Sequence, residues 1–368
     1  MTSRIPFKRV NWTNTAFLAV ITVLGFVAAP IFLWKYDLGW PMWLMFAFYI
    51  VATGLSITLG YHRLFSHLSF KAKWPVRLGT LVFGSCAFEN SAMNWCSDHR
   101  RHHKHTDHDD DPYDISKGFF WAHMGWILFK LNPVPPLDNI NDLRKDSLVR
   151  WQHKWNHLIA VVVGLAFPAA VGYALNGPIG ALGGFLVVGA LRVVCVQQCT
   201  FFINSLCHTI GRQPYSNRCS ARDSGLMALL TFGEGYHNYH HEFQHDYRNG
   251  VKASNFDPTK WMIWTLSKVG LVSDLRRVPT SKILLAEMKE ARRRAEEKMA
   301  SLQEQGGTAC EHALARVQVL MDELSKNYHE LETAMSQKIE MSKEKLNQWR
   351  RETRVMVADL GKLRVSRA

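Results

Sequence analysis

Four apolar segments, each about 20 residues or longer, place the strongest limit on how this 368-residue chain can fold. A helix of about 20 apolar residues is long enough to cross the hydrocarbon core of a bilayer. Runs such as LAVITVLGFVAAPIFLW lack the polar face of a soluble amphipathic helix, so buried core helices are the weaker alternative. The sequence therefore predicts an all-α integral membrane protein with four spans, at residues 14–34, 40–60, 155–175 and 179–203.

Basic residues indicate the orientation of these spans. Arg4, Lys8 and Arg9 precede the first span, and a long polar segment separates the second span from the third. Loops rich in Lys and Arg stay on the cytoplasmic side of a membrane. We therefore expect a multi-pass protein whose termini and polar segments are cytoplasmic. The first apolar segment is too long to be the core of a cleaved signal peptide.

The overall charge narrows the classes of partner. A net charge of +13 suits an anionic membrane surface or an anionic headgroup. No basic stripe with interleaved aromatic residues is present, so nucleic acid is not an expected partner. The seven cysteines form no CxxC pair, which predicts free thiols in a reducing compartment.

Two shorter apolar segments and a polar tail complete the domain organisation. Residues 119–129 and 261–271 are too short to span a bilayer and predict interfacial helices, with helices of a cytoplasmic cap as the alternative. We expect a membrane domain over residues 1–280 and a helical extension over 281–368, broken into two helices at Gly306-Gly307. A 3-4 spacing in the tail predicts a short coiled coil and self-association, with a solvated helical extension as the alternative. The residues of this spacing are Ala313, Val317, Leu320, Leu324, Leu331 and Ala334.

Histidine clusters at the ends of the apolar segments predict a metal centre. His99 with His102 and His103 is spaced i, i+3 and i, i+4, which places three rings on one helix face. The same geometry recurs at His237, His240 and His241, and Asn204 and His208 are also i, i+4. His62 and His67 are five residues apart, which does not stack on a regular helix but fits a helix end.

Nine histidines and one asparagine match the requirement of two first-row metal ions with open positions. Neutral imidazole suits iron, copper, zinc or nickel, and the lack of carboxylates argues against calcium, magnesium and the Glu-x-x-His type of di-iron site. Asp98, Asp107 and Glu234 are candidates to hydrogen-bond the ligands from outside, although solvated charges are the alternative. We expect the other histidines to lie outside the centre: His105, His108, His123, His153, His157, His245, His312 and His329.

Four motifs resemble those of the membrane-bound fatty acyl desaturases, in particular the stearoyl-CoA (Δ9) type, over roughly Trp12 to Leu271. They are HRLFSH (62–67), DHRRHHKHTDHDDDPY (98–113), NSLCHTIG (204–211) and GEGYHNYHH (233–241). The resemblance implies four spans, a cytoplasmic cap and two Fe²⁺ ions bound by the nine clustered histidines, with Asn204 holding an ion through a water. It implies O2-dependent introduction of a cis double bond into a saturated acyl chain. We expect a prokaryotic member in a bacterial inner membrane.

The resemblance also implies a bent tunnel for the acyl chain. Trp95 and Thr200 would flank the bend, and Ile50 and Gly54 would form the closed end, with close helix packing as the alternative for Gly54. Glu89 and Asn90 would meet the headgroup. Relatives that use acyl-CoA often carry Gln-Asn at that place, so acyl-CoA, acyl-carrier protein and phospholipid remain open as carriers.

Partners and competing functions follow from the same motifs. The sequence carries no HPGG haem motif, so we expect electrons from a separate ferredoxin or cytochrome b5. A hydroxylase or ketolase with similar histidine motifs is the nearest alternative. A metal transporter would place ligands within the spans, and a structural membrane protein would not need nine convergent ligands.

Overall fold

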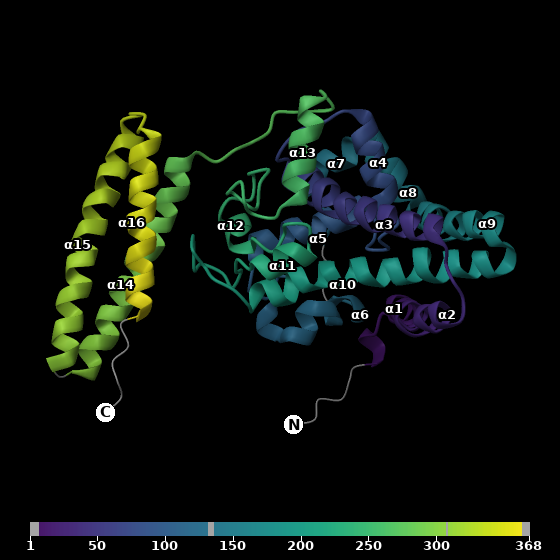
Figure 1. The fold of residues 1–368 in the computed structure, drawn as a ribbon, viewed down its shortest axis with the longest axis horizontal. Coiled ribbons are helices and arrows are strands. Elements are labelled where there is room, and N and C mark those ends of the chain that lie inside the picture. Colours follow the sequence, from purple (N-terminus) through teal and green to yellow (C-terminus); the bar gives the residue numbers. More distant parts are fainter. Residues whose placement is uncertain (1–6, 132–135, 307, 363–368) are drawn as a thin grey trace. The chain divides into compact units, whose positions relative to one another are not determined.

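The computed structural model describes residues 7–131, 136–306 and 308–362 and is mainly helical (Figure 1). The chain divides into two compact units. The first comprises Met1–Gly211 and Cys219–Arg276, and the second comprises Arg212–Arg218 and Arg277–Ala368. Gly307 of the predicted Gly306-Gly307 break lies outside the described residues.

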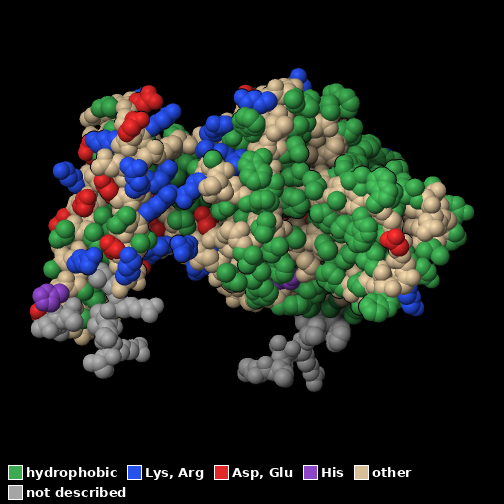
Figure 2. All heavy atoms as spheres, in the orientation of Figure 1, with side chains coloured by type: hydrophobic (Ala, Val, Ile, Leu, Met, Phe, Trp, Pro, Cys, Tyr) green, Lys and Arg blue, Asp and Glu red, His purple; other side chains and the backbone are tan. Residues whose placement is uncertain are grey.

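Three helical segments of the first unit are long and apolar enough to cross a membrane: Trp12–Lys35, Trp40–Ser66 and Ser147–His208. Many large apolar side chains on these segments are exposed, Val20, Leu44 and Phe48 among them, as expected of surfaces that contact lipid. Figure 2 shows hydrophobic side chains densely covering this face of the unit. The first two segments comprise α1 (Trp12–Val23), η2 (Leu24–Ala28), α2 (Ala29–Lys35), α3 (Trp40–Leu55) and η3 (Ser56–Ser66).

The third segment contains both of the later predicted spans and reverses direction in its middle. Asn176 and Gly177 have non-helical backbone angles, and Gly177 has a φ of +57°. A Cβ at Gly172 would collide with the carbonyl of Gly180, so the two arms pack closely through small residues. The segment comprises α8 (Ser147–Val161), η6 (Val162–Ala166), α9 (Phe167–Gly183), η7 (Gly184–Leu191), α10 (Arg192–Ser205) and η8 (Leu206–His208).

The remaining elements of this unit pack around the end of η3. Buried side chains of η3, α4, α5 and α13, including Tyr61, Leu81, Cys96 and Ile263, form one apolar core. β1 (Lys71–Ala72) pairs antiparallel with β2 (Val272–Ser273) and ties the ends of this region together. The other elements are η1 (Phe7–Arg9), α4 (Trp74–Ser85), α5 (Ala92–His105), η4 (Ile115–Lys117), η5 (Trp121–Gly125), α6 (Trp126–Leu128), α7 (Asn141–Lys145), α11 (Gly225–Leu230), α12 (His237–Glu242) and α13 (Pro258–Lys268).

Both segments predicted as interfacial helices contain short helices with exposed aromatic side chains. Phe119 and Phe120 are exposed before η5, and α13 exposes Trp261 and Trp264. Aromatic side chains favour the level of the lipid headgroups, so these faces suit the membrane–water boundary. The seven cysteines, all within the described residues, are free thiols as expected.

The second unit is a bundle of three helices, whereas two helices were predicted: α14 (Thr280–Gln305), α15 (Thr308–Ser336) and α16 (Lys343–Lys362). The additional break follows Ser336, where Lys338 adopts a left-handed φ of +56° without a glycine or proline to signal it. Val317, Leu324 and Leu331 of the predicted coiled-coil stripe are buried in the cores of this bundle. The stripe is therefore covered by helices of the same unit.

Candidate functional site

A wide helical turn brings His62 and His67 together. η3 is a π-helix, and the His67 N–H donates to the His62 carbonyl across five residues at 3.1 Å. In a π-helix residues five apart lie on one face, so the two rings meet with centroids 4.8 Å apart. His67 is the C-cap residue of η3, as predicted for a helix end, and the wide turn brings its ring edge-on to that of His62.

Two further helices carry the other histidine clusters. The Ser91 hydroxyl accepts from the Asn94 N–H and caps the N-terminus of α5, which holds His99, His102 and His103 on one side. α12, only six residues long, begins at His237, and Asp223 accepts from the Tyr239 N–H to anchor it. Nine histidines converge in two groups: His62, His67, His99, His103 and His240 in the first, and His102, His208, His237 and His241 in the second.

The spacing of the imidazole nitrogens fits first-row metal ions. Two nitrogens bound at about 2.1 Å and at right angles to one ion lie about 3.0 Å apart. In the first group, Nε2 of His240 lies 3.0 Å from Nε2 of His62 and 2.9 Å from Nε2 of His103. In the second group, Nε2 of His237 lies 3.1 Å from Nε2 of both His208 and His241. The nine predicted ligands therefore form two clusters of converging nitrogen donors.

Burial keeps these imidazoles in the neutral form that binds metals. Burial and the neighbouring histidines hold the pKa of His67, His99, His103, His240 and His241 well below the usual range. Neutral imidazole offers a lone pair, and its other nitrogen must then donate a hydrogen bond. The groups that accept these hydrogen bonds consequently orient the rings.

Glu234 is one of three predicted outer partners, and it contacts a metal group. Its Oε2 lies 2.8 Å from Nδ1 of His62, and its Oε1 accepts from Arg63 at 2.8 Å. Arg63 also donates to both oxygens of Asp257, and all three side chains are buried. Burying one cation between two carboxylates and a ligand histidine fixes the position of Glu234 and hence the His62 ring.

The other two predicted partners behave differently from each other. Asp107 accepts from Ser220, whose hydroxyl lies 2.7 Å from Nδ1 of His208, so Asp107 acts through the serine. Asp98 lines a cavity, and no described ion pair or hydrogen bond joins it to a ligand histidine. Asp111 was not among the predicted partners, yet its carboxylate lies 2.9 Å from Nδ1 of His102. The run of aspartates after the second cluster was the signal available, but it did not distinguish Asp111 from its neighbours.

The histidines set aside from the centre belong to neither metal group. His123 bonds Ser205 and Gln198, and His153 bonds Ser91. His245 bonds the carbonyl of His67, which helps to hold the end of η3. His157 lies on the wall of the cavity described next.

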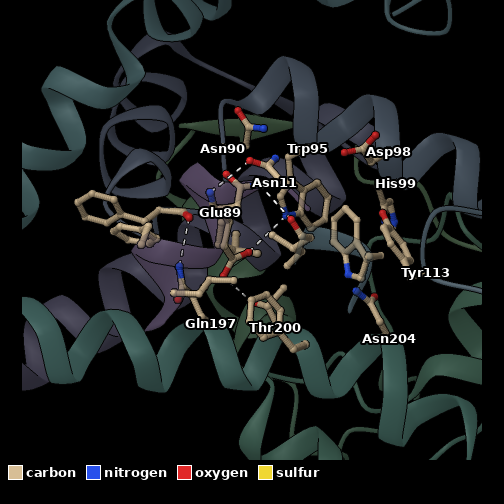
Figure 3. A pocket seen from close by; sticks show the side chains of 18 of the residues that line it. Asn11, Glu89, Asn90, Trp95, Asp98, His99, Tyr113, Gln197, Thr200 and Asn204 are labelled. Carbon is tan, nitrogen blue, oxygen red and sulfur yellow. Dashed lines mark hydrogen bonds between the residues drawn. The ribbon is translucent and has the colours of Figure 1, made fainter. Parts of the chain in front are cut away.

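A cavity of about 820 Å³ adjoins the first metal group. Its wall includes the predicted ligands His62 and His99, and much of the remainder is apolar, with Phe17, Ile57 and Phe88 among the lining side chains. Predicted residues on this wall are Glu89, Asn90, Trp95, Thr200 and Asn204. Figure 3 shows Asn204 and His99 at the same end of the cavity. This volume lies in the range of pockets that enclose organic ligands.

Glu89 contacts the two residues predicted to flank the bend of a tunnel. Its Oε1 lies 2.8 Å from the Thr200 hydroxyl, and its Oε2 accepts from the Trp95 indole N–H at 3.3 Å (Figure 3). Asn90 is exposed and also lines the cavity, and Glu89 lies between the two residues predicted to flank a bend. Glu89 therefore belongs with Trp95 and Thr200 on the cavity wall.

Ile50 and Gly54, predicted as the closed end of a tunnel, are not among the described residues that line this cavity. A Cβ at Gly54 would collide with the ring of Phe232, so Gly54 serves the close packing considered as the alternative. Ile57 and Thr58, one to two turns farther along the chain, line the cavity instead. The space beside Gly54 is therefore filled by Phe232, and the prediction that Ile50 and Gly54 close the end of a tunnel is wrong for this cavity.

Substitution of Gly54 tests this packing. We expect Gly54→Ala to destabilise the protein by about 1–3 kcal/mol, because the added methyl group overpacks against Phe232. The melting temperature of the purified protein measures this effect. Adding Phe232→Leu should restore most of the loss. Gly79, where a Cβ meets nothing within 4 Å, gives the matched control Gly79→Ala, which should not be destabilised. Equal melting temperatures for Gly54→Ala and Gly79→Ala would contradict the packing.

Known proteins similar in sequence identify the family of this chain. The sequence profile of the fatty acid desaturase family matches residues 38–266. The chain belongs to the fatty acid desaturase family. It is 39% identical to acyl-CoA desaturase 1 of Saccharomyces cerevisiae over 297 residues, covering 80% of this chain and 57% of that protein. It is 33% identical to human stearoyl-CoA desaturase 5 over 275 residues, covering 73% and 82%.

The organisms of the relatives test two expectations, the prokaryotic type and the bacterial inner membrane. The chain spans 57% of the length of acyl-CoA desaturase 1 of S. cerevisiae and of a probable acyl-CoA desaturase of Schizosaccharomyces pombe. The relatives compared come from yeasts and animals, so the comparisons do not support the prokaryotic type or the bacterial inner membrane. The family match and the long apolar helices together show that the protein is membrane-associated.

Proposed function

We propose that this protein is an O2-dependent desaturase that introduces a cis double bond, at Δ9, into the saturated chain of an acyl-CoA. One observation carries the proposal: His62 and His99 belong to the first metal group and also line the cavity. An acyl chain in this cavity would lie against the metal ligands. The names of the relatives, acyl-CoA and stearoyl-CoA desaturases, favour CoA over the other carriers.

Two iron ions fit the donor set, because nine neutral imidazoles offer two groups of converging nitrogens without carboxylates. We propose that these nine histidines hold the ions and that Asn204 contributes through a water. When bound, iron and O2 supply the oxidising power to remove hydrogen from an unactivated methylene, which no side chain can provide. The side chains of the protein bind the substrate, exclude water and hold the imidazoles in place.

The cavity residues have separate tasks in this proposal. Apolar side chains such as Phe17, Ile57 and Phe88 bind the acyl chain through burial. Trp95 stacks on His99 with ring centroids 4.9 Å apart. An acyl chain that packs against Trp95 would therefore lie beside a proposed metal-binding histidine. Glu234 and Asp111 accept hydrogen bonds from ligand rings and keep them oriented.

The proposed topology has four crossings. The reversal at Asn176 and Gly177 divides the third apolar segment into two arms, so the termini and the metal ligands lie on one side, which we propose to be cytoplasmic. Electrons would come from a separate ferredoxin or cytochrome b5. The net charge of +13 favours an acidic donor.

Expression in a host of defined lipid composition tests the function. We expect new cis-Δ9 monounsaturated chains, located by double-bond mapping, in cells that express the protein and not in cells with the empty vector. Hydroxylated or oxidised chains without a new double bond would indicate the hydroxylase or ketolase alternative. An unchanged lipid profile in cells supplied with iron and an electron donor would contradict the proposal.

A further inference from the structure

Glu89 is a carboxyl group on the wall of an otherwise largely apolar cavity, and the backbone holds it there under strain. The residues on both sides have left-handed φ angles, +57° at Phe88 and +79° at Asn90, which are unfavourable for residues with a Cβ. Such strain persists only where the surrounding structure enforces it, and it is common at functional sites. The loop is therefore built to present Glu89 to the cavity.

Two buried side chains of the third apolar segment enforce this loop conformation. The Gln197 amide donates to the carbonyls of Ala87 and Phe88 at 3.2 and 3.1 Å. The guanidinium of Arg192 donates to the carbonyl of Cys86. The loop that precedes α5 is thus fastened to α10 through its carbonyl groups, and Glu89 follows the last of them.

The hydrogen bonds around Glu89 accommodate a neutral carboxyl group. The Thr200 hydroxyl has one hydrogen, yet it lies 2.8 Å from Oε1 of Glu89 and 3.2 Å from the carbonyl of Val196. If Thr200 donates to Val196, Oε1 must carry the hydrogen that bonds Thr200. Oε2 then remains free to accept from Trp95. With Thr200 donating to Val196, a neutral carboxylic acid makes all three contacts; with Thr200 donating to Oε1, an ionised carboxylate accepts from both Thr200 and Trp95.

We infer that Glu89, hydrogen-bonded to Thr200 and Trp95 on the cavity wall, is a neutral acid when an acyl chain is bound, and that loss of its proton weakens binding of the chain. The inference rests on the proposed function. Burial raises the pKa of Glu89 to about 8, and hydrogen bonds from Thr200 and Trp95 oppose this only in part. An acyl chain in the cavity would displace water from an ionised Glu89, so substrate binds the protonated protein preferentially.

A test must distinguish the effect of Glu89 on the pH dependence of binding from the effects of other ionisable groups nearby. Cys199 of α10 and Tyr61 of η3 interact with it electrostatically. The other ionisable residues on the cavity wall are His62, Asp98, His99, Tyr113, Lys130, His157 and Glu234. Asp98 is the most informative comparison, because burial raises the pKa of this carboxyl to about 7.

Binding of stearoyl-CoA, followed by intrinsic tryptophan fluorescence between pH 6 and pH 9.5, tests the inference. For the wild type we expect the affinity to fall about tenfold between pH 7 and pH 9 as Glu89 ionises. Glu89→Gln keeps an N–H to bond Thr200 and cannot ionise, so its affinity should not change with pH over this range. Asp98→Asn should retain the pH dependence of the wild type.

Infrared difference spectra between pH 7 and pH 9.5 provide a readout of the proton itself. As the pH rises, the wild type should lose a carboxylic acid C=O band. The spectra of Glu89→Gln should not show this loss. Parallel pH dependence in the wild type and Glu89→Gln, or none in the wild type, would overturn the inference. A wild type that binds stearoyl-CoA at no pH would overturn the proposed function and this inference with it.

Discussion

His240→Ala is expected to abolish desaturation and to lower the iron content. Nε2 of His240 lies within 3.0 Å of Nε2 of His62 and His103, so this ring stands at the centre of the first metal group. Loss of an outer hydrogen-bond partner alone weakens metal binding by about 10–100-fold, and loss of a ligand should cost more. Iron content per chain and the yield of monounsaturated product measure the two effects.

His105→Ala is the matched control for this prediction. His105 lies on the same helix as His99, His102 and His103 but belongs to neither metal group. It should keep wild-type iron content and product yield. Circular dichroism and elution as a single species establish that His240→Ala remains folded. A folded His240→Ala that is active with its full iron content would contradict the assignment of ligands.

Arg63→Leu is expected to destabilise the protein more than any other change considered above. Arg63 donates to Glu234, to both oxygens of Asp257 and to the carbonyl of Tyr247, and its side chain is 1% exposed. Its removal would leave two buried carboxylates without a cation, which costs about 3–5 kcal/mol. Because Glu234 also contacts His62, iron retention should fall together with the melting temperature.

An exposed ion pair provides the contrast for Arg63. Lys71 and Asp274 lie 2.8 Å apart, and their side chains are 80% and 61% exposed. Surface pairs of this kind contribute little, so Lys71→Ala should change stability by no more than about 0.5–1 kcal/mol. If Arg63→Leu and Lys71→Ala had the same melting temperature, the Arg63 cluster would have no special role.

The apolar segments and the histidine spacing were readable from the sequence because each depends on local geometry. An uninterrupted apolar run needs no tertiary partner to indicate a membrane segment. Spacings of three and four place His99, His102 and His103 on one face of any α-helix, and the structure confirms that they converge with the other clusters. Residue type alone then predicts a metal centre.

The features that the sequence did not reveal depend on tertiary contacts. Gly54 faces Phe232, a residue 178 positions later, and no local pattern distinguishes that contact from open space. Asp111 rather than Asp98 contacts a predicted ligand: Asp98 lies within α5, whereas Asp111 lies in the turns that follow that helix and reaches back to His102. The break after Ser336 carries no glycine or proline, and Lys338 supplies the left-handed turn. Packing decides each of these outcomes.

The wide turn of η3 makes the polypeptide length between two ligands part of the metal centre. A π turn holds one residue more than an α turn and is rarely stable by itself. Deleting one residue between His62 and His67 would allow ordinary α-helical winding and would rotate everything after it by about 100°. Ion binding to both rings would in turn stabilise the extra residue, since metal affinity adds to folding free energy. Bound ions would thus stabilise the π-helical conformation of η3 against conversion to an α-helix.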